Sequence, residues 1–120
     1  MALSRGAAFW MTVIIAGAAV AGTHAWAYYD DTRGLWLKGV VRSTSYERPH
    51  QIIQLEVQKP EPGTWKVVLA SPSKMEGRGF PVSRLVPGLA AKVYVYPAKD
   101  VANEGRALRL VVDGNTTELW

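Results

Sequence analysis

Apolar and polar side chains alternate along five segments after residue 34, and an alternation with a period of two predicts β-strands. The clearest alternation lies in residues 51–58, where Ile53, Leu55 and Val57 share one face and polar side chains take the other. Proline, glycine, asparagine or aspartate bounds each segment, as is typical of turns. The predicted strands are residues 35–46, 51–58, 64–70, 91–96 and 107–112, and a short sixth strand is predicted at 116–120.

Two of these strands carry a further feature. In the first strand Gly39 predicts a bend or a bulge, because glycine inside a strand often marks one. In the fifth strand Leu108, Leu110 and Val112 occupy every second position. We therefore expect these three side chains on one side of the sheet.

The connections between the strands predict turns and one short helix. Ser71 suits an N-cap and Pro72 the first helical position, so we expect a helix of one or two turns after the third strand. Asp113 and Gly114 predict a hairpin turn. Five strands with a helix between the third and fourth is the order of an OB-like barrel. We expect an all-β, five- to six-stranded barrel of this kind over residues 28–120, with a meander or a small sandwich as the alternative.

The N-terminal segment has the plan of an export signal, in which Arg5 precedes an apolar run and no formal charge follows until Asp30. The small residues Ala19 and Ala21 favour a cut after Ala21, which makes residues 1–21 a cleaved signal peptide. A second candidate cut follows Ala27. The alternative is an uncleaved membrane anchor over residues 6–27, since about 20 apolar residues span a bilayer. Either form predicts an N-terminal hydrophobic helix. The positive charge marks the cytoplasmic end, so we expect the barrel in the periplasm.

The composition limits the domain count and the chemistry. With 120 residues, 48% of them apolar, the chain is long enough for one small domain. The sequence contains no cysteine, which excludes disulfides, cysteine-ligated metal sites and a thiol nucleophile. A net charge of +4, with cations scattered among acids, does not indicate nucleic-acid binding. Because there is also no Gly-x-Ser-x-Gly motif, we expect a non-enzymatic protein.

Several short motifs follow the order and spacing of a family of small secreted bacterial proteins. Members typically begin the mature chain with a His-His-Ser-Phe element, carry Asn-Pro-His before the second strand, and continue through Leu-x-Pro-Gly and Pro-Ala-Lys-Asp elements. The corresponding segments here are residues 24–30, 46–50, 71–80, 85–88, 97–100 and 113–114. The chain therefore resembles this family, whose function is unknown.

The chain departs from the pattern of that family at three positions. Thr23 stands where the first histidine of the pair would be, Arg48 replaces the asparagine before Pro-His, and Leu89 replaces an aspartate. A role that needs the histidine pair is therefore not expected here. The resemblance implies an exported β-barrel domain and brings no established activity.

The two histidines of the sequence, His24 and His50, are the candidate metal ligands. If cleavage after Ala21 makes Gly22 the first residue, the terminal amine, two backbone amides and the His24 imidazole can surround copper or nickel in a square plane. His50 follows Pro49, so we expect it in an extended entry to the second strand and hydrogen-bonded to a nearby loop. A metal site shared by the two histidines is the alternative. No other cofactor is expected.

Aromatic and acidic side chains gather just before the first predicted strand. Trp26, Tyr28 and Tyr29 predict packing against the barrel, because these rings combine an apolar body with a polar group. A binding surface is the alternative, and a membrane-interface belt applies if the preceding segment stays as an anchor. Asp30 and Asp31 are expected to be solvated turn acids, since neighbours on a strand point to opposite faces.

Cationic side chains are candidates for a patch on the barrel that takes an anionic glycan, a lipid headgroup or a protein. They are Lys38, Arg42, Arg78, Arg84, Arg106 and Arg109.

Taken together, the sequence predicts an exported, non-enzymatic binding or accessory module. One alternative is a small accessory subunit of a larger envelope complex, anchored by residues 6–27. The other is a periplasmic copper- or nickel-binding protein that uses His24 and His50. We expect an envelope or membrane protein as the partner, and no nucleic acid.

Overall fold

The computed structural model describes residues 25–120. The expected N-terminal hydrophobic helix, the cut after Ala21 and the candidate ligand His24 lie outside the described residues and stay predictions. Within residues 25–120, no helix has both the length and the apolar character that crossing a bilayer requires.

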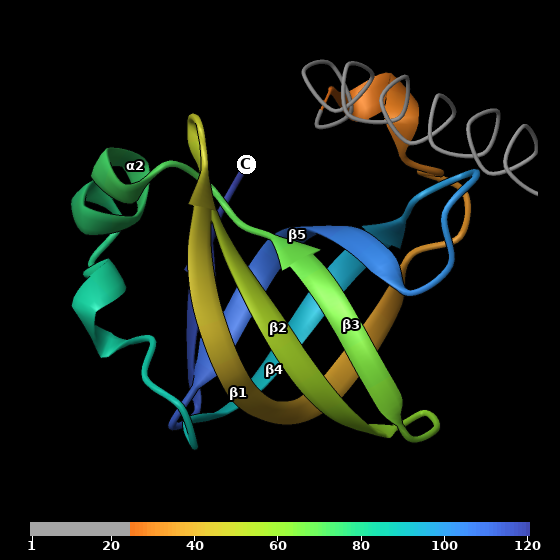
Figure 1. The fold of residues 1–120 in the computed structure, drawn as a ribbon. Helices are drawn as coiled ribbons and strands as arrows, with labels where there is room; N and C mark the ends of the chain where they lie inside the picture. The colour runs from red at the N-terminus through yellow and green to blue at the C-terminus, as the bar shows by residue number, and fades with distance from the viewer. Residues whose placement is uncertain (1–24) are drawn as a thin grey trace, which may run out of the picture.

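Six strands and three short helical segments make up the described part of the chain (Figure 1). The helical segments are the 3-10 helices η2 (Trp26–Tyr28) and η3 (Val82–Arg84) and the α-helix α2 (Pro72–Gly77). Every predicted strand is present, although the fifth begins earlier than residue 107. The strands are β1 (Leu35–Glu47), β2 (His50–Lys59), β3 (Gly63–Val68), β4 (Ala90–Pro97), β5 (Glu104–Val112) and β6 (Asn115–Glu118).

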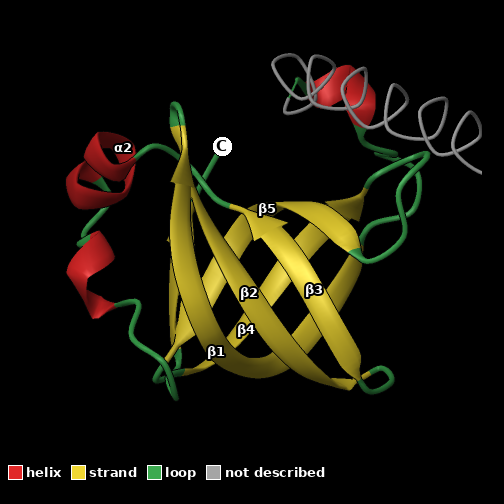
Figure 2. Ribbon diagram, in the orientation of Figure 1, coloured by secondary structure: helices red, strands yellow, loops and turns green. Residues whose placement is uncertain are grey.

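Five of these strands close into a barrel, and β6 adds one strand beside β5 (Figure 2). Antiparallel pairs link the strands in the order β3-β2-β1-β4-β5, and parallel pairing of β3 with β5 closes the ring. Asp113 and Gly114 form the turn before β6 with φ of 52° and 78°, the left-handed conformation that a two-residue hairpin turn needs. The predicted all-β barrel is confirmed, and the meander and the sandwich are excluded.

The barrel interior holds one hydrophobic core. Ile53, Leu55 and Val57 are all buried on the inner face of β2, as the alternation predicted. Each side chain of this kind contributes about 1.5–3 kcal/mol when it leaves water, so the core is the main source of stability. The other strands add Leu37, Val41, Val67, Val93, Val95, Ala107, Leu110 and Val112.

The connection between β3 and β4 packs onto this core. Met75 in α2 belongs to the core, and so do Phe80 and Leu85 farther along the connection. The Ser71 hydroxyl accepts a hydrogen bond of 3.2 Å from the backbone N–H of Lys74, which confirms the predicted N-cap. Figure 2 shows α2 and η3 together on one side of the barrel, with η2 on the opposite side.

Gly39 lies at an irregularity in the pairing of β1 with β2, where the sequence predicted a bend or a bulge. Lys38 pairs with Lys59 and Gly39 with Val57, so the extra residue of this bulge is Gln58 on β2. A Cβ atom at position 39 would collide with the carbonyl oxygen of Glu56 on β2. The close approach of the two backbones at this bulge therefore requires a residue without a side chain.

A further bulge lies in β5. Tyr94 on β4 pairs with Arg109, whereas the next residue, Val95, pairs with Ala107. Leu108 is therefore the extra residue, with no partner opposite it on β4.

This bulge corrects the prediction for the fifth strand. Ala107, Leu110 and Val112 are buried, whereas Leu108 is only partly buried and lies outside the core. The expectation that Leu108 shares the inner side with Leu110 and Val112 was wrong. The extra residue shifts the inward–outward alternation by one position. The core side chains therefore fall on an odd number before it, at Ala107, and on even numbers after it, at Leu110 and Val112.

We predict that Gly39→Ala destabilises the barrel. The added methyl group collides with backbone rather than with a movable side chain, so we expect a loss of about 1–3 kcal/mol in the free energy of unfolding. Urea denaturation of the chain measures this loss.

Gly77→Ala is the matched control, because a Cβ at the end of α2 meets no atom within 4 Å. The free energy of unfolding of this variant should stay constant or rise by up to about 1 kcal/mol. Equal losses in the two variants would contradict the steric explanation.

Candidate binding surface

The residues that precede β1 are fastened to the end of β4. Tyr29 forms a single antiparallel β-bridge with Ala98. The backbone N–H of Asp30 donates a hydrogen bond of 2.8 Å to the carbonyl oxygen of Pro97. These contacts fix the position of η2, and with it the position of Trp26, on the barrel.

A buried side-chain contact strengthens this attachment. Tyr29 is only 2% exposed, and its hydroxyl donates a 3.2 Å hydrogen bond to the carboxylate of Glu104, which is buried at the start of β5. Burial, followed by the nearby Glu104 carboxylate, raises the pKa of Tyr29 far above its usual value, although Arg106 acts in the opposite direction. The contact therefore depends on a neutral phenol.

Four aromatic rings form a continuous row over η2, β1 and β4. Trp36 lies opposite Tyr94 in the register, with ring centroids 5.3 Å apart. The ring of Tyr94 lies 6.2 Å from that of Tyr96, which lies 6.2 Å from that of Trp26. Neighbouring rings are inclined at 54°, 70° and 71°, so no two of them are parallel.

Cations lie over the same rings. The Arg106 guanidinium carbon is 3.7 Å from the ring centroid of Trp26, and the Lys92 Nζ atom is 5.2 Å from that of Trp36. Arg109 lies 5.8 Å from the ring of Tyr94. We call this surface the aromatic–cation strip; it consists of Trp26, Trp36, Tyr94, Tyr96, Lys92, Arg106 and Arg109.

The β5 bulge explains how both arginines join the strip. Arg106 pairs with Tyr96 and Arg109 with Tyr94, so each guanidinium lies beside the row of rings. In a regular strand, residues three positions apart point to opposite faces, and one of the two would face the core. The extra residue Leu108 removes this conflict.

A groove with a volume of about 270 Å³ adjoins the strip. Trp26, Tyr96, Leu108 and the C-terminal Trp120 line it. The Arg78 guanidinium holds the chain end by donating a hydrogen bond of 3.0 Å to the main-chain oxygen of Trp120. The groove therefore extends the aromatic surface as far as the C-terminus.

The three aromatic residues proposed from the sequence have different environments. Trp26 is 42% exposed and belongs to the strip, whereas Tyr29 is buried and serves packing. Tyr28 is partly buried, with its ring edge-to-face against Tyr29 at 5.0 Å. Of the three, Trp26 is the one that presents a large surface to a ligand.

The imidazole of His50 contacts the main chain just after β3. Its Nδ1 atom lies 2.8 Å from the carbonyl oxygen of Leu69, within hydrogen-bonding distance. Residues 25–120 contain no group of three or more histidine, cysteine or acidic side chains arranged to hold a metal ion. Metal binding by His24 and His50 stays a prediction, because His24 lies outside this part of the chain.

The acidic pair before β1 forms a turn. The Asp30 carboxylate accepts hydrogen bonds from the backbone N–H and the hydroxyl of Thr32, at 3.0 and 2.6 Å. These bonds lower the pKa of Asp30. Asp31 is exposed, as expected of a turn acid.

The six cations proposed as one patch are instead distributed among several partners. Arg42 forms an ion pair with Glu56 at 3.2 Å, and Arg84 lies 3.8 Å from the carboxylate of Asp113. Arg106 and Arg109 belong to the strip, and Arg109 also pairs with Glu118 at 3.2 Å.

Sequence reasoning missed Trp36, Tyr94 and Tyr96 as candidates for the binding surface. A signal was present, because these aromatic rings occupy the face of their strands opposite the core residues, where polar side chains are usual. The sequence did not show that the rings are neighbours, because this depends on the pairing of β1 with β4.

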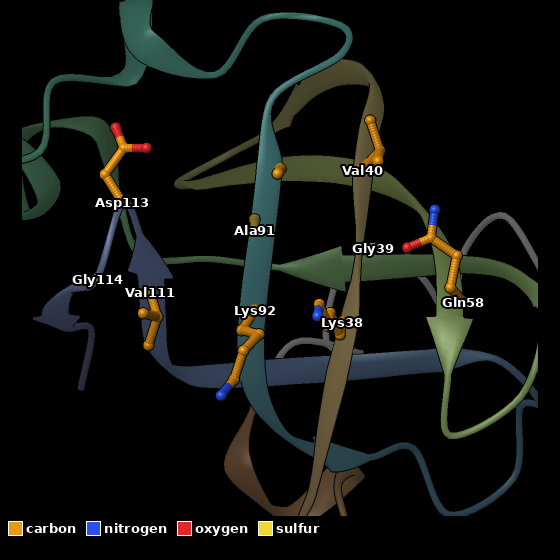
Figure 3. A pocket seen from close by; sticks show the side chains of 10 residues that line it. Lys38, Gly39, Val40, Gln58, Ala91, Lys92, Val111, Asp113 and Gly114 are labelled. Carbon is orange, nitrogen blue, oxygen red and sulfur yellow. The ribbon is translucent and has the colours of Figure 1, made fainter.

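Other hollows lie on the described surface, and a small one of about 170 Å³ adjoins His50, Ser71 and Lys74. One of about 230 Å³ lies beside β1 and β4, and Figure 3 shows Lys38 and Lys92 at one end of it and Asp113 at the other. One of about 320 Å³ lies at the β2–β3 turn, beside Pro60, Pro62 and Trp65. None of these hollows contains a row of aromatic rings with cations over them, so the strip is the stronger candidate.

We predict that Tyr29→Phe destabilises the chain and changes the dependence of its stability on pH. At neutral pH the buried Glu104 carboxylate loses a donor, which should cost about 1–3 kcal/mol. Above pH ~10 the unfolded tyrosine ionises while the buried one stays neutral, so the free energy of unfolding of the wild type falls as pH rises. The fall should be shallower in Tyr29→Phe.

Urea denaturation at a series of pH values measures both effects. Tyr46→Phe is the control, because Tyr46 is 56% exposed and its loss should change stability at neutral pH by under about 0.5 kcal/mol. If Tyr29→Phe loses stability above pH ~10 as steeply as the wild type, Tyr29 is not the group responsible.

Comparison with known proteins places the chain in a family without a known activity. No curated protein and no solved structure matches it. Residues 11–107 match the family of unknown function DUF6152. The expectation of an uncharacterised family is confirmed at this level, while the secretion and the histidine-containing motifs attached to it stay predictions. The chain belongs to the DUF6152 family.

Proposed function

We propose that this protein is an exported, periplasmic binding or accessory module, without enzymatic activity, built on an OB-like barrel. The aromatic–cation strip is its binding surface. The observation that carries the proposal is the contiguity of the outward-facing rings and the cations over them on the outside of a closed barrel. Large aromatic side chains and arginines at a solvent-exposed surface are typical of sites that bind a partner.

The order of the strands supports the OB-like part of the proposal. The ring β1-β2-β3-β5-β4, with α2 between β3 and β4, agrees with the arrangement expected from the sequence. Such barrels use their outer strand faces and loops to bind ligands. The strip lies on the outer face of β1, β4 and β5 and includes Trp26 of η2.

The residue inventory supports the non-enzymatic part of the proposal. The sequence has no cysteine and two histidines, and His50 engages the carbonyl oxygen of Leu69. In the strip, Arg109 pairs with Glu118, and the other cations lie over aromatic rings. Such an arrangement provides adhesion and charge but contains no nucleophile beside a base.

Photo-crosslinking in cells that export the chain tests the proposed binding surface. A benzophenone amino acid at the position of Trp36 should give adducts with an envelope component, because this ring is 43% exposed at the end of the strip. The same group at the position of Tyr46, near the other end of β1, is the control and should give none. Adducts at both positions, or at neither, would argue against the strip as the binding surface.

The mass of the mature protein tests export and processing. We expect a species that begins at Gly22, because a cut after Ala27 would remove Trp26 from its contact with Arg106. Mass spectrometry of the chain isolated from its membrane and periplasm reads the N-terminus directly. A full-length species that resists carbonate extraction would instead indicate the anchored accessory subunit held by residues 6–27.

A further inference from the structure

Exposed tryptophans gather at the aromatic–cation strip and its groove. Trp26, Trp36 and Trp120 are 42%, 43% and 61% exposed, and Tyr94 and Tyr96 connect them into one surface. Tryptophan and tyrosine are enriched where proteins meet the headgroup region of a bilayer, because the ring enters the apolar side and the polar group stays hydrated.

The charge of the strip is complementary to an anionic surface. Lys92, Arg106 and Arg109 bring positive charge to the strip, and Glu118 pairs with Arg109. Each lysine or arginine near an anionic leaflet contributes about 1 kcal/mol to binding. The cations lie over the rings of the strip, so electrostatic attraction and aromatic contact act at one surface.

The geometry of the rings disfavours a ligand that stacks flat on them. Neighbouring rings are inclined by 54–71°, so they offer no common plane to successive sugar rings or bases. The ring of Trp26 is also covered by Arg106 at 3.7 Å. A lipid surface requires no parallel rings, because each side chain enters the headgroup region separately.

If the chain is exported as proposed, its N-terminal segment keeps the strip close to the membrane. No formal charge lies between Arg5 and Asp30, so the apolar segment ends just before the strip begins. Five residues lead from Ala21 to Trp26, and an extended chain of this length spans roughly 18 Å at most. While residues 1–21 remain attached, Trp26 therefore stays within that distance of the end of the apolar segment.

We infer that the aromatic–cation strip docks on the surface of an anionic phospholipid bilayer. This inference rests on the proposed function, in which the strip is the binding surface, and it names the surface that the strip recognises. The rings enter the headgroup region, and Lys92, Arg106 and Arg109 contact lipid phosphates. Docking leaves α2 and η3, on the opposite side of the barrel from η2, away from the membrane (Figure 2).

A site-specific probe tests this orientation. The sequence has no cysteine, so Trp36→Cys and Tyr46→Cys each accept one environment-sensitive fluorophore without background labelling. The two positions lie near opposite ends of β1. On vesicles of phosphatidylglycerol and phosphatidylcholine in equal parts, the probe at position 36 should shift to shorter wavelength and be quenched by brominated lipid. The probe at 46 should do neither, whether or not residues 1–21 remain attached.

Vesicle flotation measures how much the cations contribute to lipid binding. It uses the unlabelled, processed chain isolated from the envelope. Lys92→Gln should lower the partition coefficient on the anionic vesicles about fivefold, because one cation is removed. Lys74→Gln, an exposed lysine of α2, is the matched control and should leave it unchanged. Raising the salt concentration should weaken wild-type binding.

The outcomes separate the lipid inference from the proposed function. Equal binding to vesicles of phosphatidylcholine alone, or equal responses of the probes at 36 and 46, overturns lipid docking. If position 36 crosslinks to an envelope protein while its probe does not respond to vesicles, the binding surface stands and the lipid inference fails. If neither experiment gives a signal at position 36, both proposals fail.

Discussion

Closure of the barrel by β3 and β5 is the constraint on which the rest of the structure depends. The two strands pair in parallel from Lys66–Glu104 to Val68–Arg106, and the backbone N–H of Lys66 also donates to the carbonyl oxygen of Asn103. This pairing buries the first residue of β5, Glu104, at the point where Tyr29 crosses the end of β4. A buried carboxylate needs a hydrogen-bond donor, and the Tyr29 hydroxyl supplies one. Barrel closure thus also determines where the residues before β1 are attached.

The position of the binding surface depends on that attachment and on the bulge at Leu108 in β5. Because Tyr29 is held at Ala98 and Glu104, η2 places Trp26 beside Tyr96 on the outer face of the barrel. The bulge at Leu108 then allows arginines three positions apart to face outward together. A regular β5 would place one of them against the core, where an unpaired charge is not tolerated. The same bulge exposes Leu108 to the groove.

The surface combines two kinds of interaction that act over different distances. Cations attract an anionic partner from about a Debye length away, whereas aromatic rings contribute only at contact. In the strip the two are neighbours, and the cation–π contacts order the long cationic side chains before a partner arrives. Less side-chain entropy is then lost on binding. For a family without an assigned activity, this pre-ordered outer face is the feature that most directly suggests a role.

The sequence by itself determined the local structure. The period-two alternation specified the buried face of β2, Ser71 and Pro72 specified the start of α2, and Asp113-Gly114 specified the last turn, because each depends on residues close in the chain. Only the tertiary structure decided the closure of β3 on β5, the bulge at Leu108 and the meeting of residues 26, 36 and 94. Strand partners and register are chosen by the packing of the whole barrel, which no single segment encodes.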